Sequence, residues 1–289
     1  MKATGRPHNA GMAIHFTKMH GCGNDFVVID ATRAAFVPTS ALLHRLTDRR
    51  FGVGCDQVLV VQQATSPEVD FDYRIFNADG SEVGQCGNGS RALAVFVRDR
   101  ALSDKAILKV QTRTARMRLQ LQADGQVQVD MGVPRFAVAE IPLALPEAPR
   151  HALMLNGFGR VEFGVASFGN PHAVLFVADV DAAPVEALGK ALQARPEFTE
   201  GVNVGFLQIV SPDLARLRVY ERGAGETLAC GSGACAAFVV AQRAGLLGSE
   251  ATLDLRGGSL ILQWPGEGAP VLMTGPAETV YTGTLEWPN

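Results

Sequence analysis

The sequence predicts an α/β fold of the α+β type, with two pseudosymmetric domains that each wrap a mostly antiparallel, curled sheet around a central buried helix. The first observation is an internal repeat: residues 73–96 align without a gap on residues 217–240, and the shift of 144 is half of the 289-residue chain. The second is that both copies run from a strand-like segment through a Gly-rich loop into an apolar segment typical of a buried helix. The third is that helices and strands do not alternate strictly, as a doubly wound parallel sheet would require.

In the first half, short apolar segments separated by polar, Gly-rich turns are predicted to be strands. Residues 40–50 have the pattern of a short helix, for which Thr39 or Ser40 is the expected N-cap. Asp124-Gly125 lies between two alternating segments and is a strong hairpin signal. Residues 1–12 lack any such pattern, and we expect them to be a disordered extension. The expected strands are residues 14–19, 26–30, 58–62, 71–76, 107–112, 115–122 and 126–131.

The second half repeats this order, and Gly169-Asn170 corresponds to Gly23-Asn24, each just before a predicted strand. A helix is expected over residues 181–194, where Pro184 would be tolerated only in the first turn. The second buried helix is expected over residues 234–244. The expected strands are residues 161–167, 173–177, 205–210, 214–220, 252–255 and 260–264, and the last two form a hairpin on Gly257-Gly258.

Composition narrows the possible function classes. Two domains of ordinary size fit the chain length, and 47% hydrophobic residues can fill two cores. A net charge of −3 with scattered basic residues argues against a nucleic-acid partner. No apolar segment is long enough to span a membrane, and no signal peptide is recognisable. The five cysteines are odd in number and widely spaced, which indicates reduced thiols in the cytoplasm rather than a disulfide framework.

Two cysteines occupy equivalent positions of the repeat, Cys86 in the first half and Cys230 in the second. Each stands where a Gly-rich loop enters a helix, so unpaired backbone N–H groups and the helix dipole favour its thiolate. We therefore expect Cys86 to be more acidic than an ordinary cysteine. A base on one face of a carbon centre and an acid on the other invert that centre, and a thiol with a pKa near the working pH can serve as either.

Two other interpretations of the cysteine pair remain open. Both thiols could simply pack in the two cores, because unpaired cysteines are often buried. They could instead form a redox pair that cycles through a disulfide. The repetition of the same polar, Gly-flanked loop favours chemistry over packing.

Several polar residues lie in the same loops and are candidates for contacts with a polar substrate. Arg222 suits bidentate binding of a carboxylate, although Glu221-Arg222 could also be a surface ion pair. His172 could orient a thiol or have a structural role. Asparagine is common in turns for conformational reasons, but five in equivalent loops indicate substrate contacts. The five are Asn24, Asn77, Asn88, Asn170 and Asn203.

Cofactor and metal signals are absent from the sequence. There is no GxGxxG motif, no recognisable pyridoxal-phosphate lysine, and no CxxC or HExxH spacing, so we expect no cofactor and no metal. Cys22 and Cys55 have no counterpart in the other half, and Cys235 lies inside an apolar helix. These three cysteines are expected to be structural.

Several motifs resemble those of the diaminopimelate epimerase family, and the match runs in order along nearly the whole chain from Ile14. The motifs are Met19-His-Gly-Cys-Gly-Asn-Asp-Phe26, Phe76-Asn-Ala-Asp-Gly-Ser-Glu82, Gln85-Cys-Gly-Asn-Gly89, Gly169-Asn-Pro-His172, Gly201-Val-Asn203, Glu221-Arg-Gly-Ala-Gly-Glu-Thr227 and Ala229-Cys-Gly-Ser-Gly-Ala-Cys235. The resemblance implies a cofactor-independent enzyme that interconverts LL- and meso-2,6-diaminopimelate on the bacterial route to lysine and peptidoglycan.

The resemblance also implies roles for individual residues. Cys86 would take the proton from the LL substrate and Cys230 would return it, with His172 in support. The implied substrate contacts are Asn24, Gln57, Asn77, Asn170, Asn203, Glu221 and Arg222, together with the backbone groups of Gly87-Asn88 and Gly231-Ser232. The implied domains are residues 1–131 with 276–289, and residues 132–275. A homodimer is expected as well.

Two positions depart from the family pattern: Cys22 stands where an aliphatic residue is common, and Ser232 where threonine is usual. Neither change removes a catalytic group. A proline or hydroxyproline racemase would share the thiol pair, but it would have no use for Arg222 and the many amides. That alternative stays open at this point.

Overall fold

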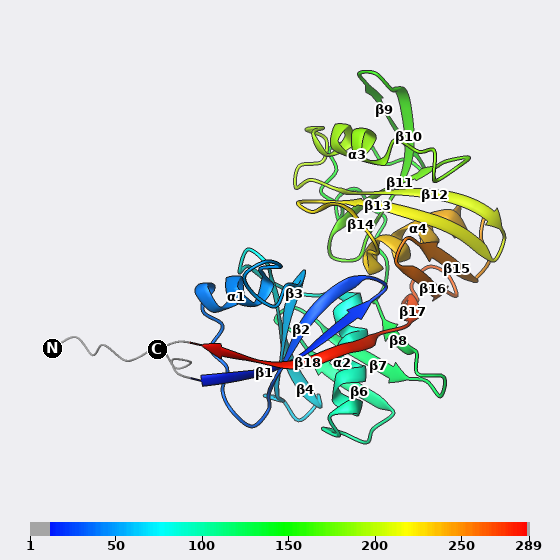
Figure 1. Ribbon diagram of the computed structural model, residues 1–289. Coiled ribbons are helices and arrows are strands. Elements are labelled where there is room, and N and C mark those ends of the chain that lie inside the picture. The colour runs from blue at the N-terminus through cyan, green and yellow to red at the C-terminus, as the bar shows by residue number, and fades with distance from the viewer. Residues whose placement is uncertain (1–11, 288–289) are drawn as a thin grey trace. The chain divides into compact units, whose positions relative to one another are not determined.

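The computed structural model describes residues 12–287. The chain divides into two compact units. Unit 1 contains the chain up to Gly21, residues Asp25–Val129 and the chain from Pro276, and unit 2 contains Cys22–Asn24 and Asp130–Gly275. In Figure 1, unit 1 holds the blue and cyan segments with the red C-terminal strand, and unit 2 holds the yellow and orange ones. Of the predicted disordered extension, residues 1–11 lie outside the described residues. The prediction is wrong for Met12, which begins strand β1.

Unit 1 is built mainly from antiparallel strand pairs. The pairs β1–β18, β3–β4, β4–β5, β6–β7 and β7–β8 are antiparallel, whereas β2–β3 and β4–β6 are parallel. The strands are β1 (Met12–Gly21), β2 (Asn24–Ala31), β3 (Gln57–Gln63), β4 (Phe71–Asn77), β5 (Glu82–Val83), β6 (Ile107–Gln111), β7 (Arg116–Leu121), β8 (Val127–Asp130) and β18 (Glu278–Trp287). The helices are α1 (Ser40–Thr47) and α2 (Gly87–Asp99).

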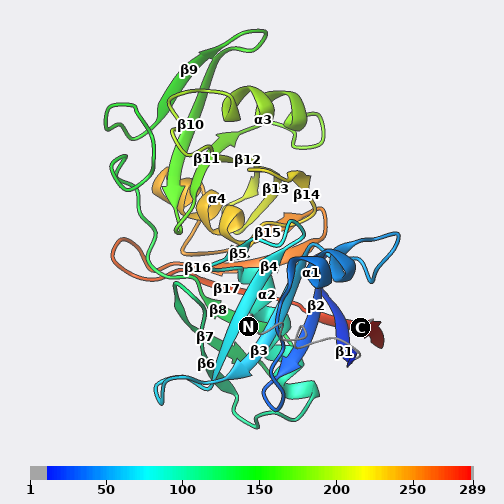
Figure 2. The ribbon, with the colours of Figure 1, turned by 90° about the vertical axis from the view of Figure 1, so that its left-hand side faces the viewer.

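Helix α2 is the buried centre of unit 1, as the sequence predicted. Every residue from Gly87 to Val97 is buried, and the helix packs against β1, β3, β7 and β18 (Figure 2). Its polar side chains are satisfied inside the core: the fully buried Arg91 donates to Pro276 O at 3.1 Å and to Asn88 Oδ1 at 3.0 Å. Because buried polar groups must be hydrogen-bonded, these contacts make the burial of Arg91 tolerable.

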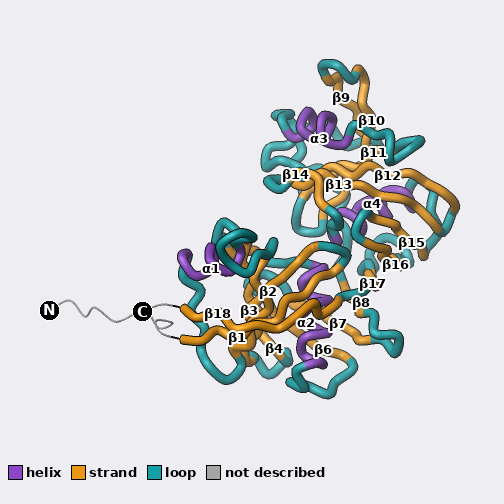
Figure 3. The backbone as a smooth tube through the Cα atoms, in the orientation of Figure 1, coloured by secondary structure: helices purple, strands orange, loops and turns teal. Residues whose placement is uncertain are grey.

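Unit 2 has the same plan around α4 (Gly231–Arg243) and carries a second helix, α3 (Val185–Gln193). Its parallel pairs are β11–β12 and β13–β15, whereas β9–β10, β10–β11, β12–β13, β13–β14, β15–β16 and β16–β17 are antiparallel. Figure 3 shows how strand-rich this unit is. The strands are β9 (His151–Leu155), β10 (Gly159–Ser167), β11 (Pro171–Phe176), β12 (Asn203–Ser211), β13 (Leu214–Glu221), β14 (Gly225–Thr227), β15 (Glu250–Leu255), β16 (Gly258–Gln263) and β17 (Leu272–Gly275).

The predicted pseudosymmetry extends to strand register. In unit 1, Phe76 of β4 faces Glu82 of β5, and in unit 2, Tyr220 of β13 faces Glu226 of β14. Each residue of the second pair lies 144 positions after its counterpart in the first. The parallel pairs β2–β3 and β4–β6 likewise correspond to β11–β12 and β13–β15. The predicted fold class is therefore confirmed.

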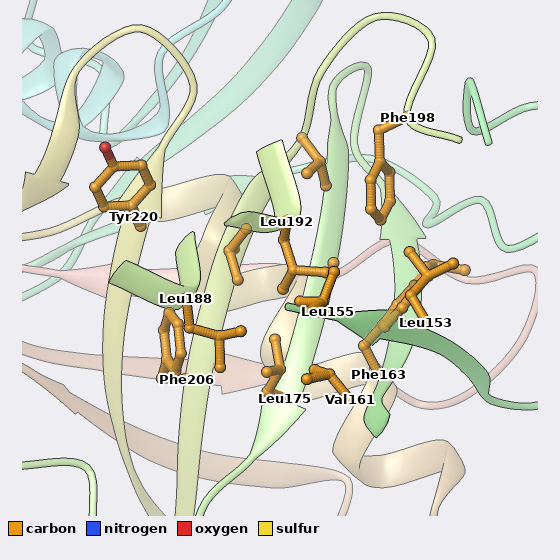
Figure 4. Close-up of a cluster of buried hydrophobic side chains, with 14 of the residues drawn as sticks. Leu153, Leu155, Val161, Phe163, Leu175, Leu188, Leu192, Phe198, Phe206 and Tyr220 are labelled. Atoms are coloured by element: carbon orange, nitrogen blue, oxygen red, sulfur yellow. The ribbon is translucent and has the colours of Figure 1, made fainter. Parts of the chain in front are cut away.

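A second core lies between α3 and the sheet of unit 2 (Figure 4). Leu188 and Leu192 of α3 pack toward Phe206 of β12 and Leu175 of β11. Because β12 also contacts α4, it is covered on both faces, and its residues Asn203–Leu207 are all buried rather than alternating.

Two expected helix boundaries are wrong, and one strand was missed. Helix α1 is capped by Thr39 but ends at Thr47, because the Asp48 carboxylate accepts hydrogen bonds from the backbone N–H groups of residues 50 and 51. Helix α3 begins at Val185 rather than at residue 181, because Pro184 has a non-helical ψ of 61° and stands at the N-cap. Strand β9 was not predicted at all. Among residues 12–287, no helix is long and apolar enough to cross a membrane.

Candidate active site

Cys86 is the N-cap residue of α2, directly after the β4–β5 hairpin. Its backbone is extended, and its Sγ accepts a hydrogen bond from the Gly89 N–H at 3.3 Å. A capping acceptor at a helix N-terminus is stabilised in its negatively charged form by the free N–H groups and by the helix dipole. The half-buried sulfur of Cys86 is therefore placed to carry negative charge.

Cys230 is the N-cap residue of α4, in the equivalent position of unit 2, but its surroundings differ. It is buried, and this burial, together with the charge of Glu221 and a hydrogen bond to it, raises the pKa of the Cys230 thiol well above its ordinary 9.0. The Gly233 N–H and the Ser232 hydroxyl oppose this rise. The expected thiol pKa near the working pH is therefore not met at Cys230, because desolvation outweighs the helix terminus.

An ion pair braces each hairpin that leads to a cysteine. Arg74 Nε and Nη2 donate to the two Glu82 oxygens at 3.0 and 2.7 Å. In unit 2, Arg218 Nε and Nη2 donate to the two Glu226 oxygens at 2.7 and 2.8 Å. Such fork-shaped pairs fix geometry as well as charge. Arg218 and Glu226 lie 144 positions after Arg74 and Glu82, so the two ion pairs occupy equivalent positions of the internal repeat.

Two predicted substrate contacts of unit 1, Gln57 and Asn77, belong to a series of connected hydrogen bonds. Gln57 Nε2 donates to Asn77 Oδ1 at 2.9 Å, and Asn77 Nδ2 donates to Ser81 Oγ at 3.1 Å. Ser81 Oγ donates to Asp79 Oδ1 at 2.6 Å. Because a carboxylate only accepts, this order fixes the sense of both amides. Gln57 Oε1 is left buried and without a hydrogen-bond partner among the described residues, so it can accept an N–H donor from a ligand.

Asn88, one of the predicted substrate contacts, also has a side-chain hydrogen bond within unit 1. It is buried, and its Oδ1 accepts from Arg91 at 3.0 Å, so its side chain helps to hold the core arginine. Gly87 begins α2, and the first N–H groups of a helix have no intrahelical partner. The backbone at Gly87-Asn88 therefore fits the binding of an anionic group.

In unit 2, the structure brings together a second set of predicted residues. Asn170 Nδ2 donates to Ser232 Oγ at 3.2 Å, and His172 Nε2 lies 3.1 Å from Asn170 Oδ1. Ser232 Oγ lies 3.7 Å from Cys230 Sγ. Burial, with a smaller effect of the Arg222 charge, lowers the pKa of His172 to about 3, so its ring is neutral.

The remaining unit 2 candidates are tied to the backbone of the same loops. Asn203 is buried, with Nδ2 donating to Pro171 O at 3.1 Å and Oδ1 accepting from the Arg222 N–H at 2.9 Å. The Arg222 guanidinium donates to Glu200 O, and the Thr227 hydroxyl donates to Glu221. Asn203 thus holds the backbone of Arg222 in place. Gly231 begins α4 next to Cys230.

Asn24 belongs to the segment Cys22–Asn24, which groups with unit 2. Cys22 has a φ of 53°, unusual for a residue other than glycine. Gly257 makes this loop possible, because a Cβ there would lie 1.8 Å from Cys22 O. Cys22, Cys55 and Cys235 are all buried, and burial raises the pKa of Cys55 to about 12.

Sequence reasoning missed a charged cluster in unit 1. Arg49 donates to both oxygens of Asp25 and to Asp56, and Lys18 donates to Asp25 and Gly54 O. The Asp56 N–H donates to Asp25 Oδ1 at 2.8 Å, which ties the start of β2 to the start of β3. Asp56 immediately precedes Gln57 in the sequence, and this adjacency to a predicted contact was the available signal.

Among residues 12–287, no group of three or more His, Cys, Asp or Glu side chains could hold a metal ion.

Comparison with known proteins identifies the family. The family model described as diaminopimelate epimerase matches residues 16–137 and 164–280. The chain belongs to the diaminopimelate epimerase family. Both cysteines, Cys86 and Cys230, lie within the matched segments.

Curated relatives in this family are similar over their whole length. The diaminopimelate epimerase of Chromobacterium violaceum is 52% identical over 276 residues, which cover 95% of this chain and 100% of the relative. That of Azoarcus sp. strain BH72 is 53% identical over 277 residues, covering 96% of this chain and 100% of the relative. The resemblance drawn from the motifs is thereby confirmed.

Solved structures share the fold of the diaminopimelate epimerase family at much lower identity. A hydroxyproline epimerase from Agrobacterium vitis, with bound trans-4-hydroxy-L-proline, is 16% identical, with a TM-score of 0.71 over 96% of this chain and 93% of that one. A phenazine biosynthesis protein of the PhzF family from Bacillus anthracis is also 16% identical, with a TM-score of 0.67 over 95% of this chain and 99% of that one. At this identity the likeness establishes the fold alone.

Proposed function

We propose that the chain is a diaminopimelate epimerase, which interconverts LL- and meso-2,6-diaminopimelate by two-base proton transfer between Cys86 and Cys230. The observation that carries the proposal is the presence of an N-cap cysteine at the same place in each of two repeated units. The curated relatives, which are 52–53% identical, supply the substrate. They also favour this reaction over that of a proline or hydroxyproline racemase. The proposed metabolic role is the bacterial synthesis of lysine and peptidoglycan precursors.

In the direction from LL substrate, Cys86 acts as the base. Its thiolate takes the α-proton and becomes a thiol, and the electron pair left on the α-carbon spreads into the α-carboxylate. The Cys230 thiol then gives its proton to the opposite face of that carbon and becomes a thiolate. The donor from Gly89 to Cys86 Sγ supports the base role, and the raised pKa of the Cys230 thiol supports the acid role. In the reverse direction the two roles exchange.

Substrate binding in this proposal uses the polar groups near each of the two cysteines. The α-carboxylate is an anion, and the N–H groups at Gly87-Asn88 and Gly231-Ser232 suit it because they begin helices. The buried Gln57 Oε1 suits an ammonium N–H. The further proposed contacts are Asn24, Asn77, Asn170, Asn203, Glu221 and Arg222, with His172 in support.

We also propose a cytoplasmic homodimer. The reaction needs both thiols reduced, which the cytoplasm provides. Strand β18 exposes Val280 and Tyr281, two large apolar side chains that a second subunit could cover. Sedimentation of the purified chain tests this part: a monomer at micromolar concentration would refute the homodimer.

Solvent isotope exchange tests the reaction. In deuterated water, diaminopimelate should gain deuterium at one α-carbon during turnover, and Cys86→Ala and Cys230→Ala should each abolish turnover. Cys235→Ala is the matched control, because this cysteine lies in α4 but is buried in the core, and it should retain activity. Normal turnover in Cys86→Ala would overturn the proposal. So would inversion of hydroxyproline without inversion of diaminopimelate.

A further inference from the structure

Four side chains of unit 2 form a continuous hydrogen-bond chain that ends at the sulfur of Cys230. It runs from His172 Nε2 to Asn170 Oδ1 at 3.1 Å, from Asn170 Nδ2 to Ser232 Oγ at 3.2 Å, and from Ser232 Oγ to Cys230 Sγ at 3.7 Å. His172 comes from β11, Asn170 from the residues just before β11, and the other two from the start of α4. His172 and Cys230 are both buried.

Only one donor-to-acceptor direction along these hydrogen bonds is compatible with a thiolate at Cys230. A thiolate has no hydrogen to give, so the Ser232 hydroxyl must donate to sulfur and must therefore accept from Asn170. The Asn170 amide then presents its oxygen to His172, which must donate through Nε2–H. A neutral imidazole has one N–H and can supply this donor, and His172 is neutral. A thiol at Cys230 could instead donate to Ser232, and every link could then run in reverse.

We infer that Ser232 is a positioning residue whose hydroxyl donates a hydrogen bond to the Cys230 sulfur and stabilises the Cys230 thiolate. Asn170 and His172 hold the hydroxyl in this orientation. With regard to turnover, this inference rests on the proposed function, because Cys230 must become a thiolate after it has given its proton. The chain partly offsets the burial that disfavours this charge. It also gives His172 a role that acts through Asn170 rather than by direct contact with the sulfur.

Charged groups from the neighbouring elements act on the same sulfur. Glu221, at the end of β13, disfavours the thiolate through its charge and by accepting a hydrogen bond from the Cys230 thiol, and the Gly233 N–H of α4 favours the thiolate. Arg222 acts on His172 by opposing its protonation, which keeps the ring neutral. Ser232 is therefore the side-chain donor that counteracts Glu221. Loss of the Ser232 hydroxyl should leave the Gly233 N–H to oppose the effects of burial and Glu221.

The alkylation rate of each cysteine measures this effect without any substrate. The full chain is treated with iodoacetamide at pH 8, and labelling of Cys230 and Cys86 is followed separately by peptide mass spectrometry. Loss of one donor should raise the Cys230 pKa by about one unit, which lowers its thiolate fraction about tenfold. A more basic thiolate is also more nucleophilic, so Ser232→Ala should slow Cys230 labelling about three- to tenfold. Cys86 labelling should not change.

Two further variants separate positioning from a purely structural role. Ser232→Thr keeps the hydroxyl and should restore the Cys230 rate to within about twofold of wild type. Asn170→Asp places an acceptor-only group beside Ser232, which draws the hydroxyl away from sulfur, and should slow Cys230 as Ser232→Ala does. An unchanged or faster Cys230 rate in Ser232→Ala, with Cys86 unchanged, would overturn the inference. Because no substrate enters this assay, its result is independent of the diaminopimelate assay.

Discussion

The two hairpin ion pairs provide an internal comparison, because they are equivalent in sequence and geometry but differ in burial. In the Arg74–Glu82 pair the side chains are 37% and 23% exposed, whereas in the Arg218–Glu226 pair they are 19% and 18% exposed. Glu226 also accepts from Arg256 at 3.1 Å. We predict that Glu226→Gln destabilises unit 2 more than Glu82→Gln destabilises unit 1.

The magnitude follows from the surroundings of each carboxylate. Two unit charges about 4 Å apart attract by about 1 kcal/mol in water and by about 4 kcal/mol at an effective dielectric constant of 20. The more exposed Glu82 lies near the lower limit, so we expect a loss of about 1 kcal/mol. Glu226→Gln removes the carboxylate that the mostly buried Arg218 binds through two hydrogen bonds, and we expect a loss of about 2–3 kcal/mol. Arg256 is 53% exposed and adds little.

The assay must resolve the two units, because a single unfolding transition need not describe both. Hydrogen exchange of peptides from β4–β5 and β13–β14, measured in increasing urea, gives the free energy of opening in each unit. Glu186→Gln is the control, because its i,i+4 pair with Lys190 is exposed and should contribute less than about 0.5 kcal/mol. A loss in Glu82→Gln that equals or exceeds the loss in Glu226→Gln would refute this reasoning about burial.

Two other predictions concern packing and pH. In Gly189→Ala, the new Cβ would lie 2.5 Å from Tyr220 Cγ. We expect this overpacking to cost about 2–3 kcal/mol, which outweighs the roughly 1 kcal/mol by which a helix favours alanine over glycine. A variant more stable to urea than wild type would contradict this prediction. Burial acts to raise the pKa of Asp25, but hydrogen bonds from Arg49 and Lys18 hold it below its ordinary 3.8. This stabilisation is present above about pH 4 and is lost at lower pH, so the stability difference between wild type and Asp25→Asn should shrink from about pH 5 to pH 2; a constant difference would refute it.

The repeated element could be predicted because its signals are local. A Gly-rich loop that ends in cysteine and leads into an apolar segment specifies a capped, buried helix, and both α2 and α4 follow this pattern. The identical shift between the two copies also predicts equal strand register, because register follows from the alternation of buried and exposed residues. These features depend on interactions between residues that are close in the sequence, so the local pattern predicts them.

Other features depend on contacts between distant parts of the chain. The role of Asn88 could not be predicted, because it depends on Arg91, whose burial in turn depends on Pro276, 185 residues further along. The same holds for the strained backbone at Cys22, which fits only because Gly257 lacks a side chain. The sequence does not indicate which distant residues these side chains and backbone groups contact. Local pattern therefore predicted the elements, but not the polar contacts that fix them.

The duplication gives two cysteines the same backbone position but unequal electrostatic surroundings, and this inequality bears on the proposed reaction. Both sulfurs have a backbone N–H donor three residues further on, but Cys86 is half-buried, whereas Cys230 is buried near the Glu221 carboxylate. After one inversion from the LL side, the proton would sit on Cys86 and the charge on Cys230, where it is less stable. In the proposed reaction, return to the starting protonation would then be favourable and would prepare the enzyme for another LL substrate. The Ser232 hydroxyl would stabilise the negative charge on Cys230 enough for this thiolate to form. Two repeated units would thus give an enzyme whose resting protonation state favours reaction from the LL substrate.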